Sequence, residues 1–322
     1  MNGSGSGRDA ADARLHLVAE ADGPRVRLVT MRSAFPVALR RTGPERVHLV
    51  GTGAWPLGGD RVRMLIEVGP GANLDVATVA ANVALPGRSG RPSVSEVQVR
   101  VAPGGRLRLD LGPTIVATGA DHRASVDVAL GRGAGVALRE LVILGREHEA
   151  GGRSDQRVAV TVEGRAVVRE HALRPHPQAS LFVDGGARAV GSVIAVGAGM
   201  TSAAPGVDAG SGAVYALPGD RGWRAVAFGD DVAAVERWLT TRWEGAGLPD
   251  GSLGIGRGTG DQSCCPGGPS PSGPCPPPGS PCPPSSAGGS VSAGGSVVSS
   301  VVSSGSGEGS AGVSPGSSGS SG

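Results

Sequence analysis

Residues 55–80, WPLGGDRVRMLIEVGPGANLDVATVA, decide the predicted fold. Apolar side chains alternate with others along residues 62–68, and the alternation resumes along residues 74–78. A period of two is typical of a strand with one buried face. Gly69-Pro70-Gly71 separates the two runs, with a fixed φ at proline and freedom for positive φ at the glycines, as a reversal requires. We interpret the stretch as a hairpin with one apolar face.

The loop that precedes this hairpin, Leu57-Gly58-Gly59-Asp60, has a different character. Paired glycines let the backbone approach another group closely, and the Asp60 carboxylate lies where the strand begins. The loop is therefore either a binding site or a tight turn.

The strand-turn-strand unit recurs at an interval of about thirty residues, which indicates an internal repeat. Residues 96–111 form the second copy and residues 124–144 the third, each with a glycine-rich turn. Further hairpins are predicted at 13–29, 157–171 and 214–228, and a helix at 230–243 capped by Asp230 or Asp231. The fold class is therefore mainly β, with antiparallel hairpins stacked in two layers and one or two peripheral helices.

Composition divides the 322 residues into three parts: a flexible N-terminus at 1–12, a β domain at 13–246 and a disordered tail at 247–322. The Gly, Ser and Pro of the tail cannot bury enough apolar surface to become ordered. All four cysteines lie in that tail without the spacing of a zinc module, so the domain has no disulfide, as suits a reducing compartment (Cys264, Cys265, Cys275, Cys282).

A formal net charge of +2 gives no electrostatic footprint for nucleic acid or an acidic membrane surface. The N-terminus has no apolar signal region, and no later apolar run approaches the length that spans a bilayer. We therefore expect a cytoplasmic protein with neither nucleic acid nor membrane as a partner.

Glu140 breaks the pattern of the third repeat, because it shares the phase of four apolar neighbours (Val136, Leu138, Val142, Leu144). A buried carboxylate is costly unless it is paired or hydrogen-bonded. Either a bulge offsets the alternation here, or this end of the face is solvated, or Glu140 lines an internal passage or pairs with an arginine.

Two histidines are weak candidates for metal ligands. His122 stands between Asp121 and Arg123 at a predicted strand start, where a hydrogen-bonded loop residue is the more common outcome. His148 lies between Glu147 and Glu149, but in one strand its side chain would face away from both, so spacing alone gives no chelate. The folded part contains neither a glycine elbow with a serine nucleophile nor a cysteine-histidine pair, and it has no phosphate-binding glycine loop.

Four segments in order carry a resemblance to a known family: LGGDR at 57–61, VGPGANLDVAT at 68–78, GGRLRLDLGPTIVATGADHR at 104–123, and Gly145-Arg146 after Glu140. In content, order and spacing they resemble the UreD (UreH) family of urease accessory proteins. Gly58, Gly59, Thr78 and Arg146 occupy the motif positions.

The resemblance implies a non-enzymatic scaffold. It would bind urease apoprotein, recruit the accessory protein UreF and through it UreG, and assist nickel insertion into the urease active site. Nickel would be held transiently, with no tightly bound cofactor, in an internal passage. A passage for such a cation should contain carboxylates that bind weakly enough to release it. Asp60 and Glu140 fit that need, and Glu149 is a substitute for the glutamate that the family has after Gly-Arg.

Two other functions remain open. A β-sandwich could bind a sugar or another protein through its loops, although the aromatic side chains that stack on sugars are few. A hydrolase using Asp60 and Glu140 would need both carboxyl groups close together in one pocket.

Overall fold

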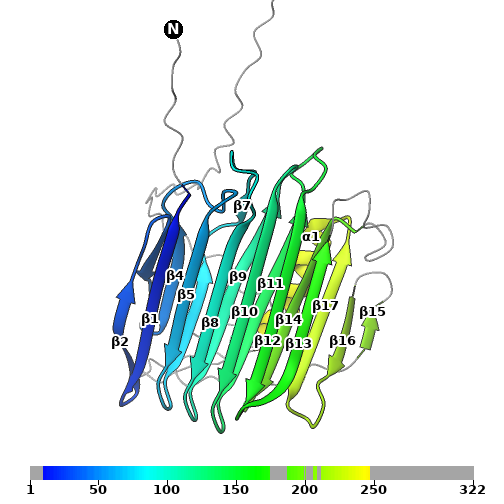
Figure 1. Cartoon of the computed structure of the whole chain (residues 1–322). Helices are drawn as coiled ribbons and strands as arrows, with labels where there is room; N and C mark the ends of the chain where they lie inside the picture. Colours follow the sequence, from blue (N-terminus) through cyan, green and yellow to red (C-terminus); the bar gives the residue numbers. More distant parts are fainter. Residues whose placement is uncertain (1–9, 175–186, 199, 201–205, 209–211, 247–322) are drawn as a thin grey trace, which may run out of the picture. The chain divides into compact units, whose positions relative to one another are not determined.

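The computed structural model describes residues 10–174, 187–198, 200, 206–208 and 212–246, so the predicted tail at 247–322 lies outside the described residues. The described chain forms two β-sheets with one helix, α1 (Val232–Gly245). Figure 1 shows the strands side by side in two layers. The seven-stranded sheet has the order β13 (Arg165–Arg174), β12 (Arg153–Val162), β10 (Asp121–Leu130), β8 (Ser93–Val101), β5 (Arg61–Val68), β1 (Asp12–Asp22) and β2 (Arg25–Arg32). The ten-stranded sheet has the order β15 (Gly206–Asp208), β16 (Gly212–Ala216), β17 (Gly222–Gly229), β14 (Ala189–Gly197), β11 (Gly135–Leu144), β9 (Arg106–Val116), β6 (Asn73–Thr78), β4 (Arg46–Gly51) and β3 (Val37–Arg41), with β7 (Asn82–Ala84) also paired to β9.

The three central repeats are arches that join the two sheets. The strand before each turn (β5, β8, β10) lies in the seven-stranded sheet, and the strand after it (β6, β9, β11) lies in the ten-stranded sheet. Each strand pairs in parallel with its equivalent in the next repeat. The prediction of antiparallel hairpins stacked in two layers is therefore wrong for this region. The sheets are mixed and the arrangement resembles a β-solenoid.

Hydrogen bonds between successive turns hold the arches in register. The Gly71 amide donates to the Pro103 carbonyl at 3.2 Å, and the Gly104 amide donates to the Arg132 carbonyl at 3.0 Å. Alternation could not reveal this arrangement, because an arch and a hairpin both turn the same side chains inward. They differ only in which strand receives the backbone hydrogen bonds.

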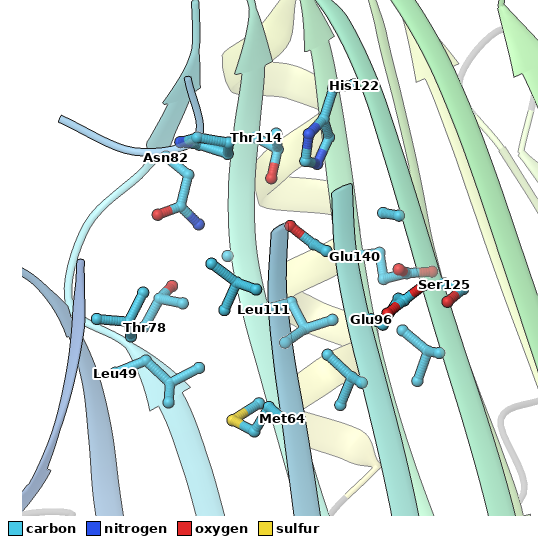
Figure 2. Close-up of a pocket in the computed structure, with 18 of the residues that line it drawn as sticks. Leu49, Met64, Thr78, Asn82, Glu96, Leu111, Thr114, His122, Ser125 and Glu140 are labelled. Carbon is cyan, nitrogen blue, oxygen red and sulfur yellow. The ribbon is translucent and has the colours of Figure 1, made fainter. Parts of the chain in front are cut away.

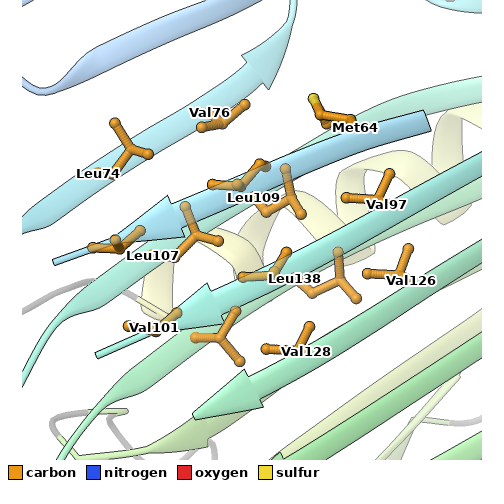
Figure 3. Packing of buried hydrophobic residues seen from close by; sticks show 14 of the residues in the cluster. Met64, Leu74, Val76, Val97, Val101, Leu107, Leu109, Val126, Val128 and Leu138 are labelled. Atoms are coloured by element: carbon orange, nitrogen blue, oxygen red, sulfur yellow. The ribbon is translucent and has the colours of Figure 1, made fainter. Parts of the chain in front are cut away.

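The core lies between the two sheets and is built from equivalent positions of the repeats. Met64, Val97 and Val126 stand side by side in the seven-stranded sheet, and Leu74 and Leu107 are neighbours in the opposite one. All five are buried in one cluster, whose packing Figure 3 shows. Each such side chain contributes about 1.5–3 kcal/mol by leaving water. The repeat period thus stacks apolar residues on one another.

The hairpins predicted outside the central repeats are confirmed. β1 and β2 pair antiparallel across Asp22 and Gly23, β12 and β13 across Glu163 and Gly164, and β16 and β17 across the segment that contains Gly219. The mixed pairing thus comes from antiparallel hairpins flanking parallel arches.

The predicted helix packs on the outer side of the ten-stranded sheet, against β14, β17 and β11. Asp231 caps it by accepting a hydrogen bond from the Ala234 amide at 3.0 Å. Gly191 lies beneath Leu239, where an added Cβ would be 2.4 Å from Leu239 Cδ1, so the glycine allows the close approach. None of the helical segments in the described residues has both the length and the apolar character needed to cross a membrane.

Candidate functional site

Two cavities inside the sandwich share Glu140 and Gln156 in their walls. The larger has a volume of about 80 Å³ and the smaller about 40 Å³. Figure 2 shows the larger cavity, with His122, Thr114 and Asn82 toward one end, Leu49 and Met64 toward the other, and Glu140 between. Glu140 is thus the carboxylate at which the two cavities meet.

Of the predicted alternatives for Glu140, the structure favours the one in which its side chain lines a space between the sheets. The pairing of β9 with β11 shifts register here, but the extra residue lies in β9, where Asp110 to Pro113 faces Arg139 to Leu141, so the alternation of β11 is not offset. Arg139 is directed to the helix side, where its guanidinium lies 3.4 Å from Asp110 Oδ2 and 3.7 Å from Glu236 Oε1. The next residue, Glu140, still lines the space between the sheets.

Its surroundings place Glu140 between two protonation states at neutral pH. Burial raises the pKa of Glu140 to about 7, and the nearby carboxylate of Glu170 acts in the same direction. The guanidiniums of Arg174 and Arg224 oppose this shift. A carboxyl group with such a pKa can exchange a proton for another cation near pH 7.

The wall of the larger cavity is mostly apolar but includes a few polar groups. Trp55 Nε1 and Ser95 Oγ belong to residues of its wall and are buried without a hydrogen-bond partner in the part of the protein that the structure describes. A space of this size with polar partners has room for more than one water molecule. The cavity therefore has room and polar partners for water beside Glu140.

Asp60 is part of a tight turn. The residue as a whole is 1% exposed to solvent. Its Oδ1 accepts a hydrogen bond from the Ala11 amide at 2.8 Å, and its Oδ2 accepts one from the Leu57 amide at 3.0 Å. An added Cβ at Gly58 would lie 2.3 Å from the Gly87 nitrogen, and Gly59 has a φ of +97°. The geometry thus favours the turn interpretation of this loop, and Asp60 is not among the residues that line either cavity with Glu140.

Glu149 and Arg146 form a local pair in the loop after β11. Arg146 Nε donates to Glu149 Oε2 at 2.7 Å, and the Thr118 amide donates to Oε1 at 3.1 Å. The hydrogen bonds from Arg146 lower the pKa of Glu149 to about 2. His148 in the same loop is highly exposed, with its Nε2 3.6 Å from Glu147 Oε1. The loop therefore does not join Glu140 in a cavity wall.

Thr78 lies at the end of β6 and lines the larger cavity beside Gly112. Gly112 has a φ of +62°, and an added Cβ there would lie 2.2 Å from Thr78 Oγ1. Glycine is needed at this position because the backbone is left-handed and because a Cβ would collide with the facing threonine.

His122 belongs to β10 and also lines the larger cavity. Its ring is almost fully buried and its Nδ1 lies 2.9 Å from Ser93 Oγ. Burial lowers the pKa of His122 to about 4, although the nearby Asp121 favours the charged form, so the ring is neutral at pH 7. Among the described residues, no group of three or more His, Cys, Asp and Glu could hold a metal ion.

The sequence interpretation missed Glu170, Arg174 and Arg224, which line the smaller cavity with Glu140. Glu170 and Arg224 form an ion pair between the two sheets. A signal was present, because Glu170 and Arg174 share the phase of the buried Val168, so the test that identified Glu140 applies to them too.

Comparison with known proteins gives a consistent result. The family described as UreD urease accessory protein matches residues 11–249. The urease accessory protein UreD of Frankia alni is 36% identical over 278 residues, which cover 73% of this chain and 93% of that protein. The urease accessory protein UreD of a Parafrankia species is 36% identical over 275 residues, covering 76% of this chain and 91% of that protein. The chain therefore belongs to the UreD family of urease accessory proteins.

Proposed function

We propose that this protein is a non-catalytic maturation factor that binds urease apoprotein and the accessory proteins UreF and, through UreF, UreG. In this role it assists nickel insertion into the urease active site. Membership of a family of urease accessory proteins supports the role in general. The observation that carries the mechanism is Glu140, a carboxylate between the sheets where two cavities meet.

The cavity walls suit transient binding of a divalent cation. Glu140 supplies an oxygen ligand, and the hydroxyl and amide groups of Thr78, Thr114 and Asn82 supply neutral oxygens. Oxygen donors from carboxylates, carbonyls and water hold hydrated cations. Asp60 and Glu149 remain proposed contributors, and their hydrogen bonds to the backbone suggest that they hold the loops around the passage.

A hydrolase is less well supported. Such an enzyme would need Asp60 and Glu140 in one pocket, whereas Asp60 accepts two backbone amide hydrogen bonds and lines neither cavity. Two catalytic carboxylates of a hydrolase must lie on either side of the same substrate bond, in one pocket. The scaffold therefore remains the function that the geometry favours.

The test is co-expression of the urease subunits and the other accessory proteins with and without this chain. Urease should lose its bound nickel when the chain is absent, and affinity-tagged chain should retain urease and UreF. Glu140→Ala should keep the assembly but lower the nickel content of urease. Glu20→Ala provides a matched control, because Glu20 is an outer carboxylate paired with Arg27. If urease kept its full nickel content in the absence of the chain, the proposed function would be refuted. If urease kept its full nickel content with Glu140→Ala, the role of Glu140 would be refuted.

A further inference from the structure

Strand β2 forms an open edge of the seven-stranded sheet. It pairs with β1 on one side, and no other strand of the described residues pairs with its far side. Figure 1 shows it at the outer end of that sheet. Alternate N–H and C=O groups of an edge strand have no partner in the sheet, so an edge of eight residues is a template for a further strand.

The two faces of β2 differ in chemistry. Apolar side chains point to the inside of the sandwich, because Ala21, Ala19 and Leu17 of β1 are their cross-strand neighbours (Val26, Leu28, Met31). Arginines point to the outer face (Arg25, Arg27, Arg32). A register shift leaves Val29 without a partner on β1, and both Val29 and Met31 are exposed, at 46% and 41%. A strand added beside β2 would therefore extend an apolar inner face and a basic outer face.

The open side of β2 is basic. Residues 25–48, which include β2, β3 and β4, contain six arginines and one acidic residue, Glu45. Glu20 pairs with Arg27 at 2.8 Å, but it belongs to β1, on the paired side of the strand. Arg25 and Arg32 have no ion pair within the described part of the chain, whereas Glu96 pairs with two arginines further inside the sheet. An acidic side chain beside the open edge would be favoured by these charges.

The same charges argue against two other occupants. If β2 of a second copy added to this edge, arginines would lie opposite arginines, which is unfavourable. The chain's own segments outside the described residues contain no run in which acidic residues alternate with apolar ones. The edge therefore suits a strand from a different protein.

We propose that the open edge of β2 receives an extended segment of a partner protein, in which acidic residues alternate with apolar ones. The segment becomes the next strand of the seven-stranded sheet. Its acidic side chains lie beside Arg25, Arg27 and Arg32, and its apolar side chains cover Met31. In this mode of recognition the main-chain hydrogen bonds give affinity and the alternating side chains give specificity. The Val26 carbonyl, which accepts a hydrogen bond from Arg41 Nη2 at 3.5 Å, is exchanged to the new strand.

The experiment measures binding of a fluorescent peptide, with glutamates and valines in alternation, to the purified full-length protein by fluorescence anisotropy. One control peptide has lysines in place of the glutamates, and another has all its glutamates before all its valines. Only the alternating acidic peptide should bind. Arg32→Glu should bind it at least about tenfold more weakly, because like charges would then lie side by side. Arg100→Glu is the matched control, because it makes the same change in charge on an inner strand, β8, and should bind as the wild type does.

Hydrogen exchange of the wild-type protein gives a second readout that does not depend on whether a variant folds. The peptide should slow exchange of the β2 amides and leave those of β8 unchanged. The proposal would be overturned by unprotected β2 amides, by equal affinity of Arg32→Glu and the wild type, or by equal binding of the peptide with separated glutamates and valines. Self-association of the wild type that Arg32→Glu abolishes would assign the edge to a second copy and overturn it too. None of these measurements involves nickel, so the proposed function is tested separately.

Discussion

The carboxylates of Asp60 and Glu140 were predicted from the sequence to serve the same purpose, but they lie in regions of opposite character. Asp60, at the start of β5, accepts two backbone amides and holds a turn together. In the described residues, no side-chain hydrogen bond satisfies Glu140 in this way, and its carboxyl group lines two cavities. A carboxylate whose oxygens hold the backbone stabilises the fold, whereas one that faces a cavity remains available to a ligand.

The largest effect is expected at Asp60. Asp60→Ala should lower the free energy of unfolding by about 2–6 kcal/mol, because the partly buried amides of Ala11 and Leu57 lose their acceptor and each unsatisfied group costs about 1–3 kcal/mol. Chemical denaturation measures this loss. Asp60→Asn, which keeps one acceptor oxygen, should lose less. If Asp60→Ala were as stable as the wild type, the structural role of Asp60 would be wrong.

Glu140, unlike Asp60, should make the protein less stable when its carboxyl group is ionised, so stability should depend on pH. In the unfolded chain this group loses its proton near 4.5, whereas the folded protein retains it until about 7. The stability that Glu140 contributes is therefore complete below pH 4.5 and is lost as the pH rises through 7. A shift of this size corresponds to about 3 kcal/mol. The raised pKa of Glu170 adds a loss of the same sign.

Glu140→Gln isolates this contribution, because glutamine has no proton to lose. The variant should gain stability over the wild type between pH 5 and pH 8, as measured by denaturation across that range. Parallel profiles for the two proteins would show that Glu140 is not in a desolvated site.

A glycine-to-alanine substitution should destabilise the protein more in the wall of the larger cavity than in an open turn. Gly112→Ala should cost about 1–3 kcal/mol because of its left-handed backbone, with a further cost from the contact with Thr78 Oγ1. Gly133→Ala is the matched control, since Gly133 also has a positive φ but has nothing within 4 Å of an added Cβ. Thr78→Ala should recover part of the loss in Gly112→Ala but none in Gly133→Ala, and thermal denaturation of the double variants tests this coupling.

The smallest effect is expected at Glu149. Its contacts with Arg146 and Thr118 belong to an exposed loop, where ion pairs are strongly screened by solvent. Glu149→Gln should leave the melting temperature unchanged within error. A clear loss of stability would mean that this loop supports the sandwich as the Asp60 turn does.

The candidate site was only partly predictable. Glu140 could be identified because a charged residue on an apolar phase is conspicuous, and the same test would have found Glu170. The sequence left the Asp60 loop open between a binding site and a tight turn, because the Ala11 amide that helps to decide it is 49 residues away. His122 lies at the start of a strand as expected, but its hydrogen-bond partner Ser93, from the neighbouring strand, could not be predicted.

The sequence by itself determined the alternation of apolar residues, the glycine turns, the repeat of about thirty residues, the flanking hairpins and the capped helix. These are local features, set by backbone preferences and by the face on which each side chain lies. Only the tertiary structure decided that the central units are arches, because the burial pattern of a strand is the same whichever neighbour receives its hydrogen bonds. The cavity at Glu140 also depends on the tertiary structure, because its walls come from strands of both sheets that are distant in the sequence.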